Sequence, residues 1–500
     1  MPRVPVRLML APFFGLAFVF AEARGRDDAP RRNLVLFLVD DLGWQDCSVP
    51  HHSASTPFNE RYRTPHLERL AAEGVVFTQA YASAPVCTPT RTSIMTGRSP
   101  AANDITYWIL HGDQDTSAKH PMVRAPEWNI RGLQEEDSTL PRILSDAGYV
   151  TIHAGKAHLG ARGTSGADPH HLGFAVNIAG HAAGGPGSFY GAHDFSAAWR
   201  GGGNVWDVPG LEEYHGRDVF LTEAIAERAL AELDDPVTTG TPFFLHFAPY
   251  AVHAPIMANR RYLDSYAELD EREASYATMI ETVDAALGAL LAKLSALGVL
   301  EETAIIFTSD NGGLSAHARG GEKHSHNAPL RSGKGSAYEG GVRVPFVTRI
   351  PGVTRAGTRS DVPVISHDLF PTLLALADVD VPDDHDVEGV DLMPAFGGGP
   401  LEDERDLYWH MPHFWGVHGP GIEPYSAVRS GDWKLLWFHP DRRLELYDLA
   451  TDVGESRDVA AKEPEVVKRL TESLSKWLAR TDAGLSIDVE TGDPVALPRR

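Results

Sequence analysis

Three short, continuous apolar runs constrain the fold more than any other feature of the chain. They are N-L-V-L-F-L-V at 33–39, P-F-F-L-H-F-A at 242–248 and T-A-I-I-F-T at 303–308. Unbroken apolar runs of this length are typical of strands that are buried on both faces, as in parallel sheets. The stretches 218–233 and 274–297, which lie between these runs, predict helices. We therefore expect an α/β fold with a large, mostly parallel central sheet flanked by helices.

Acidic and amide side chains directly follow two of the apolar runs. Asp40 and Asp41 come after the first run, and Asp310 and Asn311 come after the third. Because ligands of open α/β sheets bind at the carboxyl ends of the strands, these side chains are expected at one edge of the sheet. Adjacent carboxylates repel each other unless a cation lies between them, and oxygen ligands suit Ca²⁺ or Mg²⁺. The alternative for Asp40 and Asp41 is a turn with two solvated acids.

The stretch C-T-P-T-R-T-S-I-M-T-G, which begins at Cys87, has the features of a helix start. Pro89 suits the first turn, where a missing N–H costs nothing, and the final glycine suits the end of the helix. The expected cap is Thr88 or Cys87. Cys87 would then lie at the positive pole of the helix, with Arg91 one turn further on, and both features favour an anion. The alternative is a buried structural cysteine, the usual state of a free cysteine.

The same stretch resembles the formylglycine signature C-x-P-x-R-x-x-x-x-T-G of type I sulfatases at every fixed position. G-Y-V-T-I-H-A-G-K-A-H at 148–158 resembles the second signature of that family, with Ala157 where the family usually carries an aromatic residue. Further segments that resemble the family lie at 330–345, 365–377 and 445–460. On these motifs the chain is identified as a member of the type I sulfatases, within the alkaline-phosphatase-like superfamily. The family fold adds a smaller C-terminal α+β domain, an antiparallel sheet with one helix.

The resemblance implies a modified nucleophile and a metal ion. Cys87 would be oxidised after synthesis to formylglycine, whose hydrate is the nucleophile. This step requires a partner, a formylglycine-generating or anaerobic sulfatase-maturating enzyme. One Ca²⁺ per chain would be held by four oxygen-bearing side chains: Asp40, Asp41, Asp310 and Asn311.

The resemblance also implies roles for five basic side chains. Arg91 and Lys156 would hold the hydrate, and Lys156 and Lys334 would bind oxygens of the sulfate. His253 would face the leaving alcohol, and His158 the second hydroxyl of the hydrate. With the Ca²⁺, these cations make the expected pocket net positive, as an anionic substrate of a chain with a formal net charge of -23 requires. The same net charge argues against nucleic acid as a partner.

Composition along the chain predicts its division into parts. The N-terminus combines arginines, an apolar middle and an A-x-A cleavage site, as in a signal peptide, so the mature chain is expected to be exported, periplasmic or secreted. No stable membrane span is expected. Cys47 has no partner if Cys87 is modified, so no disulfide is expected. The predicted parts are a signal peptide at 1–23, a catalytic domain at 30–385, a linker at 386–406 and a C-terminal subdomain at 407–500.

Two stretches indicate the substrate class. T-Y-W-I-L-H-G-D-Q-D-T-S-A-K-H-P at 106–121 and Y-W-H-M-P-H-F-W at 408–415 look like those of bacterial exo-acting carbohydrate sulfatases. A sulfated saccharide is therefore the expected substrate, with galactose or N-acetylgalactosamine sulfate preferred. His410 and His413 are expected at the mouth of the pocket, whereas the neighbouring tryptophans are expected to pack the small domain onto the large one. The glycine-rich segment 180–203 is either a surface loop or a lining of the substrate site.

Three alternative functions are compatible with these motifs. The first is a phosphonate or phosphate ester hydrolase and the second an arylsulfatase, each with the same nucleophile. The third is an unmodified protein that binds sulfated glycans without hydrolysing them. Turnover of matched aryl sulfate, phosphonate and phosphate esters separates the enzymatic alternatives, and the chemical state of Cys87 tests the third.

Overall fold

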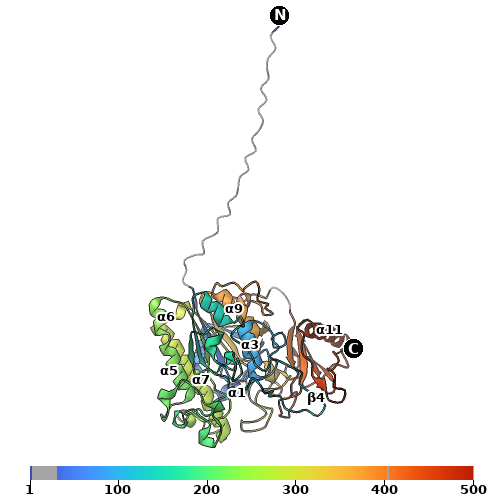
Figure 1. Ribbon diagram of the computed structural model, residues 1–500, viewed down its shortest axis with the longest axis horizontal. Coiled ribbons are helices and arrows are strands. Elements are labelled where there is room, and N and C mark those ends of the chain that lie inside the picture. The colour runs from blue at the N-terminus through green and yellow to red at the C-terminus, as the bar shows by residue number, and fades with distance from the viewer. Residues whose placement is uncertain (3–30, 402–404, 499–500) are drawn as a thin grey trace. The chain divides into compact units, whose positions relative to one another are not determined.

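The central element of the computed structural model (Figure 1) is a mixed sheet. Within the described residues it has eight strands, in the order β10-β2-β9-β8-β1-β7-β5-β6. The structure describes residues 1–2, 31–401 and 405–498, so the predicted signal peptide lies outside it except for two residues. Neighbouring strands are parallel, except that β9 is antiparallel to both β8 and β2. The strands are β1 Asn33–Val39, β2 Val75–Phe77, β5 Val150–Gly155, β6 Val176–Ile178, β7 Phe243–Ala248, β8 Thr303–Ser309, β9 Phe346–Arg349 and β10 Thr358–Ser360.

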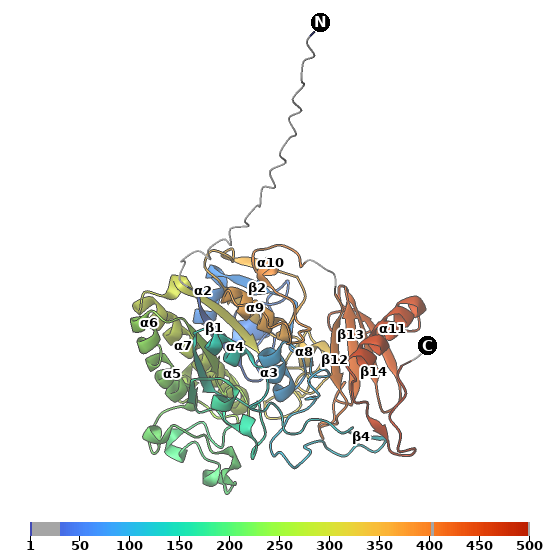
Figure 2. The same ribbon diagram turned by 45° about the horizontal axis from the view of Figure 1, so that its top comes forward.

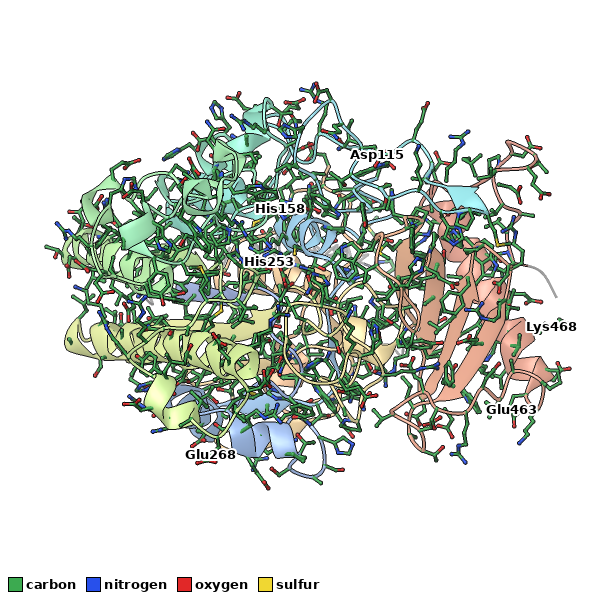
Figure 3. The ribbon with its side chains drawn as sticks, turned by 90° about the horizontal axis from the view of Figure 1, so that it is seen from below. Asp115, His158, His253, Glu268, Glu463 and Lys468 are labelled. Carbon is green, nitrogen blue, oxygen red and sulfur yellow. The ribbon has the colours of Figure 1, made fainter. Side chains whose placement is uncertain are left out.

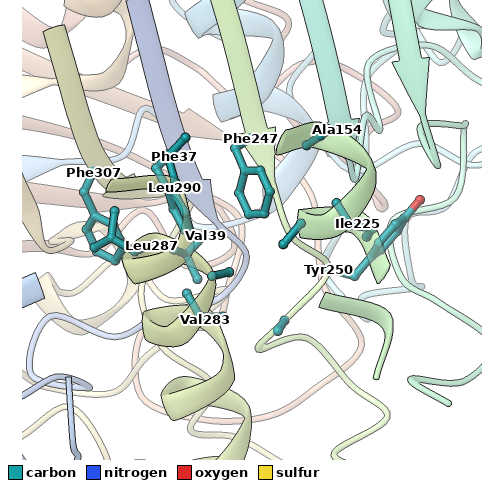
Figure 4. Packing of buried hydrophobic residues seen from close by; sticks show 14 of the residues in the cluster. Phe37, Val39, Ala154, Ile225, Phe247, Tyr250, Val283, Leu287, Leu290 and Phe307 are labelled. Carbon is teal, nitrogen blue, oxygen red and sulfur yellow. The ribbon is translucent and has the colours of Figure 1, made fainter. Parts of the chain in front are cut away.

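The two faces of this sheet are covered by different helices, because successive side chains of a strand point to opposite faces. Alternate residues of β1 from Val35 to Val39 pack with α2, α5 and α7. Those from Leu34 to Leu38 pack with α3, α4 and α9. Figure 4 shows Phe37, Phe247 and Phe307 of neighbouring strands in the first cluster, beside α7. The helices are α1 Pro57–Arg61, α2 Pro65–Glu73, α3 Cys87–Thr96, α4 Leu140–Asp146, α5 Leu221–Ala231, α6 Asp234–Thr239, α7 Glu271–Ala296, α8 Glu339–Val342, α9 Leu369–Leu376, α10 Met393–Phe396 and α11 Pro464–Arg480.

The start of α3 differs in one detail from the prediction. The helix begins at Cys87, but its N-cap is Val86, which has extended backbone and makes no side-chain cap bond. Thr88 does not cap it, because its hydroxyl contacts Nε2 of His158 at 3.1 Å and accepts a bond from the backbone N–H of Ile109. Gly97 ends the helix in the left-handed conformation at a φ of 70°, as predicted.

The C-terminal part contains a four-stranded antiparallel sheet in the order β12-β13-β14-β15. One face packs on α11, and Figure 2 shows that helix lying along the strands. The other face packs on Tyr81, Tyr107 and Tyr338 from the part of the chain that carries the large sheet. The strands are β12 Leu407–Met411, β13 Tyr425–Ser430, β14 Trp433–Phe438 and β15 Leu444–Asp448. Two short pairs complete the fold: β3 Ala80–Tyr81 with β11 Val364–Ile365, and β4 Val123–Arg124 with β16 Ile487–Asp488.

This architecture confirms the predicted fold class. A large, mostly parallel sheet lies between helices, and an antiparallel sheet with one helix follows it. Residues 32–500 cluster as one compact unit. Of the helices in the described ranges, none is both long and apolar enough to cross a membrane.

Candidate active site

Four oxygen-bearing side chains meet where β1 and β8 end. The two strands are parallel neighbours whose last residues, Val39 and Ser309, are register partners. The residues that follow each strand are therefore brought to the same edge of the sheet. All four residues are fully buried: Asp40, Asp41, Asp310 and Asn311.

Cys87 lies at the same place, because α3 begins there. Its Sγ is 3.5 Å from Oδ1 of Asp40 and 4.0 Å from Oδ1 of Asp41. One ligand atom from each of Asp40, Asp41, Cys87 and Asp310 lies within 4.8 Å of every other. Burial raises the pKa of the Cys87 thiol to about 12, although Lys156 and Lys334 oppose this. The unmodified thiol is therefore protonated near neutral pH.

Each of the three buried carboxylates is paired with a cationic side chain. Lys156 Nζ donates to both carboxylate oxygens of Asp40 at 2.8 Å. Lys334 Nζ is 2.7 Å from Asp41 Oδ1 and also donates to Cys87 Sγ at 3.4 Å. A third pair joins Arg91 Nε to Asp310 Oδ2 at 2.8 Å. The pairing compensates the cost of burying three acids, which would be prohibitive for isolated charges.

The ion pairs have different effects on the pKa values of the adjacent residues Asp40 and Asp41. Burial raises the pKa of Asp40 to about 8, against the opposing effect of Lys156. Burial also disfavours ionisation of Asp41, but Lys334 and His253 outweigh it and hold the pKa of Asp41 below its usual range. The two neighbouring carboxyl groups therefore have different proton affinities.

The donor set fits a hard divalent cation. Asp41 Oδ2 and Asn311 Oδ1 are buried and have no hydrogen-bond partner within the described chain. Asn311 Nδ2 donates to Asp41 Oδ1 at 2.8 Å and to the carbonyl of Gly312 at 3.0 Å, which leaves its Oδ1 as an acceptor. Buried acceptors without a partner are costly, and a cation would satisfy both. Carboxylate and amide oxygens are the ligands that Ca²⁺ takes in proteins.

Two histidines lie beside this cluster, and Figure 3 labels both. His253 Nε2 is 3.8 Å from Asp41 Oδ2, and its Nδ1 contacts the carbonyl of Ala254 at 2.7 Å. His158 Nε2 contacts the carbonyl of Ile109 at 2.7 Å, and its buried Nδ1 has no hydrogen-bond partner in the described structure. Burial lowers the pKa of His253 to about 3 and that of His158 well below its usual value. Both rings are therefore neutral near pH 7 in this state.

The glycine-rich segment packs directly on these histidines. A Cβ atom at Gly184 would lie 2.4 Å from Cε1 of His158, and one at Gly185 would lie 2.8 Å from Nδ1 of His253. Residues 182–189 are buried, so this part of the segment is not an exposed surface loop. Glycine permits the backbone to approach both rings where any other residue would collide with them.

A buried ion-pair network supports the loop that carries Asp41. Arg319 pairs with Asp46 at 3.0 Å and with Glu273 of α7 at 2.7 Å. Asp46 Oδ2 accepts bonds from the backbone N–H of Gly43 at 3.0 Å and from the hydroxyl of Tyr276 at 2.7 Å. Arg319 is thus linked, through Asp46, to the turn that follows β1. No local sequence motif points to this network, because its members are scattered between positions 43 and 319.

The cavity beside Cys87 has a volume of about 290 Å³. It is lined by Cys87, His158, His253 and Lys334, together with Trp108, Trp206, His317 and Trp415. None of the last four residues was predicted from the sequence to belong to the site. Trp108 and Trp415 do lie within the two stretches that indicated the substrate class, at 106–121 and 408–415.

His410 and His413 do not line this cavity, which corrects the prediction that they lie at its mouth. His410 is buried in the C-terminal sheet, where Nδ1 contacts the hydroxyl of Ser426 at 2.8 Å. His413 is buried against Tyr107, with ring centroids 4.7 Å apart, and contacts the hydroxyls of Thr106 and Ser117 at 2.8 Å. Their imidazole nitrogens are used within the fold, so these side chains hold the 408–415 stretch in place.

A buried cluster of acids and bases at the carboxyl edge of a mostly parallel sheet is suited to an anionic ester. The fold and this cluster define a hydrolase of the alkaline-phosphatase-like superfamily.

Comparison with known proteins defines the family. A family model described as Sulfatase matches residues 32–379, and one described as N-sulphoglucosamine sulphohydrolase, C-terminal, matches residues 333–482. The chain is 31% identical over 423 residues to N-acetylgalactosamine-6-sulfatase of Canis lupus familiaris, covering 80% of this chain and 75% of that protein. It is 30% identical over 530 residues to Arylsulfatase A of Homo sapiens, covering 96% and 95%.

A solved structure agrees with this result. The crystal structure of Ps i-CgsB aligns with a TM-score of 0.73 at 26% identity, covering 89% of this chain and 92% of that chain. That protein has also been solved in complex with k-i-k-neocarrahexaose. The chain therefore belongs to the sulfatase family, whose members are sulfuric ester hydrolases.

Proposed function

We propose that this sulfatase removes sulfate from a carbohydrate by means of a formylglycine formed from Cys87 and one Ca²⁺. The observation that carries the proposal is the convergence of Cys87, three acids and three cations beside the cavity that Cys87 and Lys334 line. The N-acetylgalactosamine-6-sulfatase relative and the neocarrahexaose complex support a sugar as the alcohol part of the ester. We infer that the enzyme is exo-acting, because the cavity is small and would hold only the end of a saccharide chain.

The residues divide the chemistry between binding and proton transfer. Asp40, Asp41, Asp310 and Asn311 would hold Ca²⁺, which supplies positive charge to polarise the sulfate. A formylglycine at position 87 would supply, through its hydrate, one hydroxyl for attack on sulfur and a second for the release of sulfate.

The cationic side chains stabilise charge on the sulfate oxygens. Lys156 and Lys334 would bind those oxygens, and Arg91 donates to the carboxylate of Asp310 and to the backbone carbonyl of Lys156. Fixed cations in a desolvated pocket stabilise developing negative charge more strongly than they would in water.

The histidines move protons. With the negatively charged ester bound, a protonated His253 would give the proton on Nε2 to the leaving oxygen, and Nδ1 of His158 is available to accept one when sulfate is released. General acid and base catalysis of this kind contributes about 10²–10⁴-fold in rate.

The division of the chain belongs to the same proposal. A catalytic domain at 30–385 and a C-terminal subdomain at 407–500 would be joined by a linker at 386–406. The signal peptide would direct the protein out of the cytoplasm, to the periplasm or beyond. A maturating enzyme would convert Cys87 before or during export.

The proposal is tested with protein made in a host that carries the converting enzyme. Mass spectrometry of the Cys87 peptide should show an aldehyde in place of the thiol. Sulfate release should then be measured from 4-nitrophenyl sulfate and from monosulfated galactose and N-acetylgalactosamine, with Cys87→Ala as the inactive control. Faster turnover of matched aryl phosphonates or phosphates would contradict the proposal, as would an active Cys87→Ala variant.

A further inference from the structure

The cavity has a charged end and an aromatic end. The charged end consists of Lys334, His158 and His253 around Cys87. The other walls contain three half-buried tryptophans that come from separate segments of the chain, Trp108, Trp206 and Trp415. Apolar side chains complete these walls: Val86, Ala254, Leu314 and Val417.

Trp415 is held in a fixed position relative to the charged end. A Cβ atom at Gly335 would lie 2.3 Å from Cε3 of Trp415, so the indole rests directly on the backbone of Gly335. Gly335 follows Lys334, whose Nζ is 2.7 Å from Asp41 Oδ1. The indole is therefore anchored one residue away from a side chain that we assign to sulfate binding.

The other two tryptophans are also tied to the site. The backbone carbonyl of Trp206 accepts a bond from the N–H of Gly187 at 2.6 Å, which links it to the segment that packs on the catalytic histidines. Trp108 precedes Ile109, whose backbone carbonyl contacts Nε2 of His158 at 2.7 Å. The aromatic walls are thus built into the same framework as the catalytic groups, and they are not incidental surface residues.

The walls also limit what the cavity accepts. Its volume, about 290 Å³, is at the small end of ligand pockets, which suits one ring. The only cationic side chain among the described lining residues is Lys334, and it is already paired with Asp41. Burial lowers the pKa of His317, so this side chain is neutral near pH 7 and offers no fixed positive charge. A second sulfate or a carboxylate on the ring would therefore lose its hydration without gaining a cationic partner.

We propose that Trp108, Trp206 and Trp415 form a leaving-group subsite that accepts one neutral, singly sulfated sugar ring. The C–H faces of the ring would pack on the indoles while its sulfate reaches Lys334 and Cys87. This inference rests on the proposed carbohydrate sulfatase activity. Beyond that activity, it specifies that the subsite holds one sugar ring, that the ring carries no charge besides its sulfate, and which residues select such a ring.

The experiment compares substrates and variants of the matured enzyme. Sulfate release is measured from a monosulfated neutral hexose, a sulfated uronate, a disulfated hexose and 4-nitrophenyl sulfate. Trp415→Ala should lower kcat/KM for the neutral hexose about tenfold or more through a higher KM, and Trp415→Phe should restore most of it. Trp433→Ala, at a half-buried tryptophan of β14 outside the cavity, is the matched control and should leave kcat/KM unchanged. Unfolding temperatures identify any variant that has lost its fold.

The outcomes separate this inference from the proposed function. The wild-type enzyme should turn over the uronate and the disulfated sugar at least about 100-fold less efficiently than the neutral hexose. Comparable turnover of the charged sugars, or unchanged kinetics in Trp415→Ala, would overturn the subsite while the sulfatase activity stands. Release of sulfate from 4-nitrophenyl sulfate alone would overturn it as well. No release from any ester by protein with a converted Cys87 would refute both.

Discussion

Gly184 lies so close to His158 that a Cβ atom at position 184 would stand 2.4 Å from Cε1 of the imidazole ring. The backbone of the glycine-rich segment thus sets the position of a side chain that we assign to proton transfer. Because the ring is buried, it cannot move aside without breaking its contacts with Ile109 and Thr88.

The first prediction concerns this contact. Gly184→Ala should lower kcat about tenfold or more, because displacement of the ring by even a fraction of an ångström disturbs proton transfer. Gly203→Ala is the matched control, since a Cβ atom there would meet nothing within 4 Å. Steady-state kinetics on an aryl sulfate, together with unfolding temperatures, test the prediction. Equal kcat values for the two variants would show that the close approach has no catalytic role.

The second prediction concerns the metal site. Ca²⁺ should raise the unfolding temperature of the wild-type protein, since a ligand at 100 times its Kd stabilises the folded state by about 2.7 kcal/mol. Asp310→Ala should abolish this shift and lower activity more than about 100-fold. Asp361→Ala, at an exposed acid, should behave like wild type. Full activity after exhaustive chelation would argue against a required cation.

The third prediction concerns the Glu273–Arg319 ion pair. Burial disfavours ionisation of Glu273, but Arg319 outweighs it and lowers the pKa of Glu273 from 4.5 to about 2. Between these pH values the unfolded state binds a proton that the native state does not, so the pair's contribution is complete above about pH 4.5 and is lost as the pH falls toward 2. Glu273→Gln should cost about 3 kcal/mol above pH 5, and the difference should shrink by about 1.4 kcal/mol per pH unit below 4.5.

Urea unfolding at pH 6, 4.5 and 3.5 measures this pH dependence. Glu271→Gln, at an exposed acid in the first turn of the same helix, is the control and should show no such trend. A stability difference between Glu273→Gln and wild type that does not change with pH would contradict the assigned pKa.

The fourth prediction concerns His410. Since its ring is buried and bonded to Ser426 and Gly484, His410→Ala should destabilise the protein by about 1–3 kcal/mol. The ratio of activities on a sulfated sugar and on an aryl sulfate should stay constant, because the side chain does not line the cavity. Chemical unfolding and kinetics on both esters test this together. A selective loss on the sugar would return His410 to the substrate site.

Local sequence was sufficient to predict the structure of several parts of the molecule. The apolar run at 33–39 predicted β1 at its observed bounds, and the helix that follows Val86 was predicted with its end at Gly97. These features depend on burial, on side-chain period and on the left-handed conformation of glycine, all of which act over a few residues. The meeting of Asp40 and Asp310 could be predicted because parallel neighbouring strands end at a common edge.

Tertiary structure alone decided which other residues reach the site. Trp206 and Trp415 line the cavity although 208 positions separate them, whereas His413, two residues before Trp415, is buried against Tyr107. The sequence shows which aromatic and imidazole side chains are present, but it does not show whether each of them faces the cavity or is buried elsewhere. Which of them faces the cavity depends on how the C-terminal sheet packs on the large domain, and that packing is set by contacts between distant residues which no local pattern records.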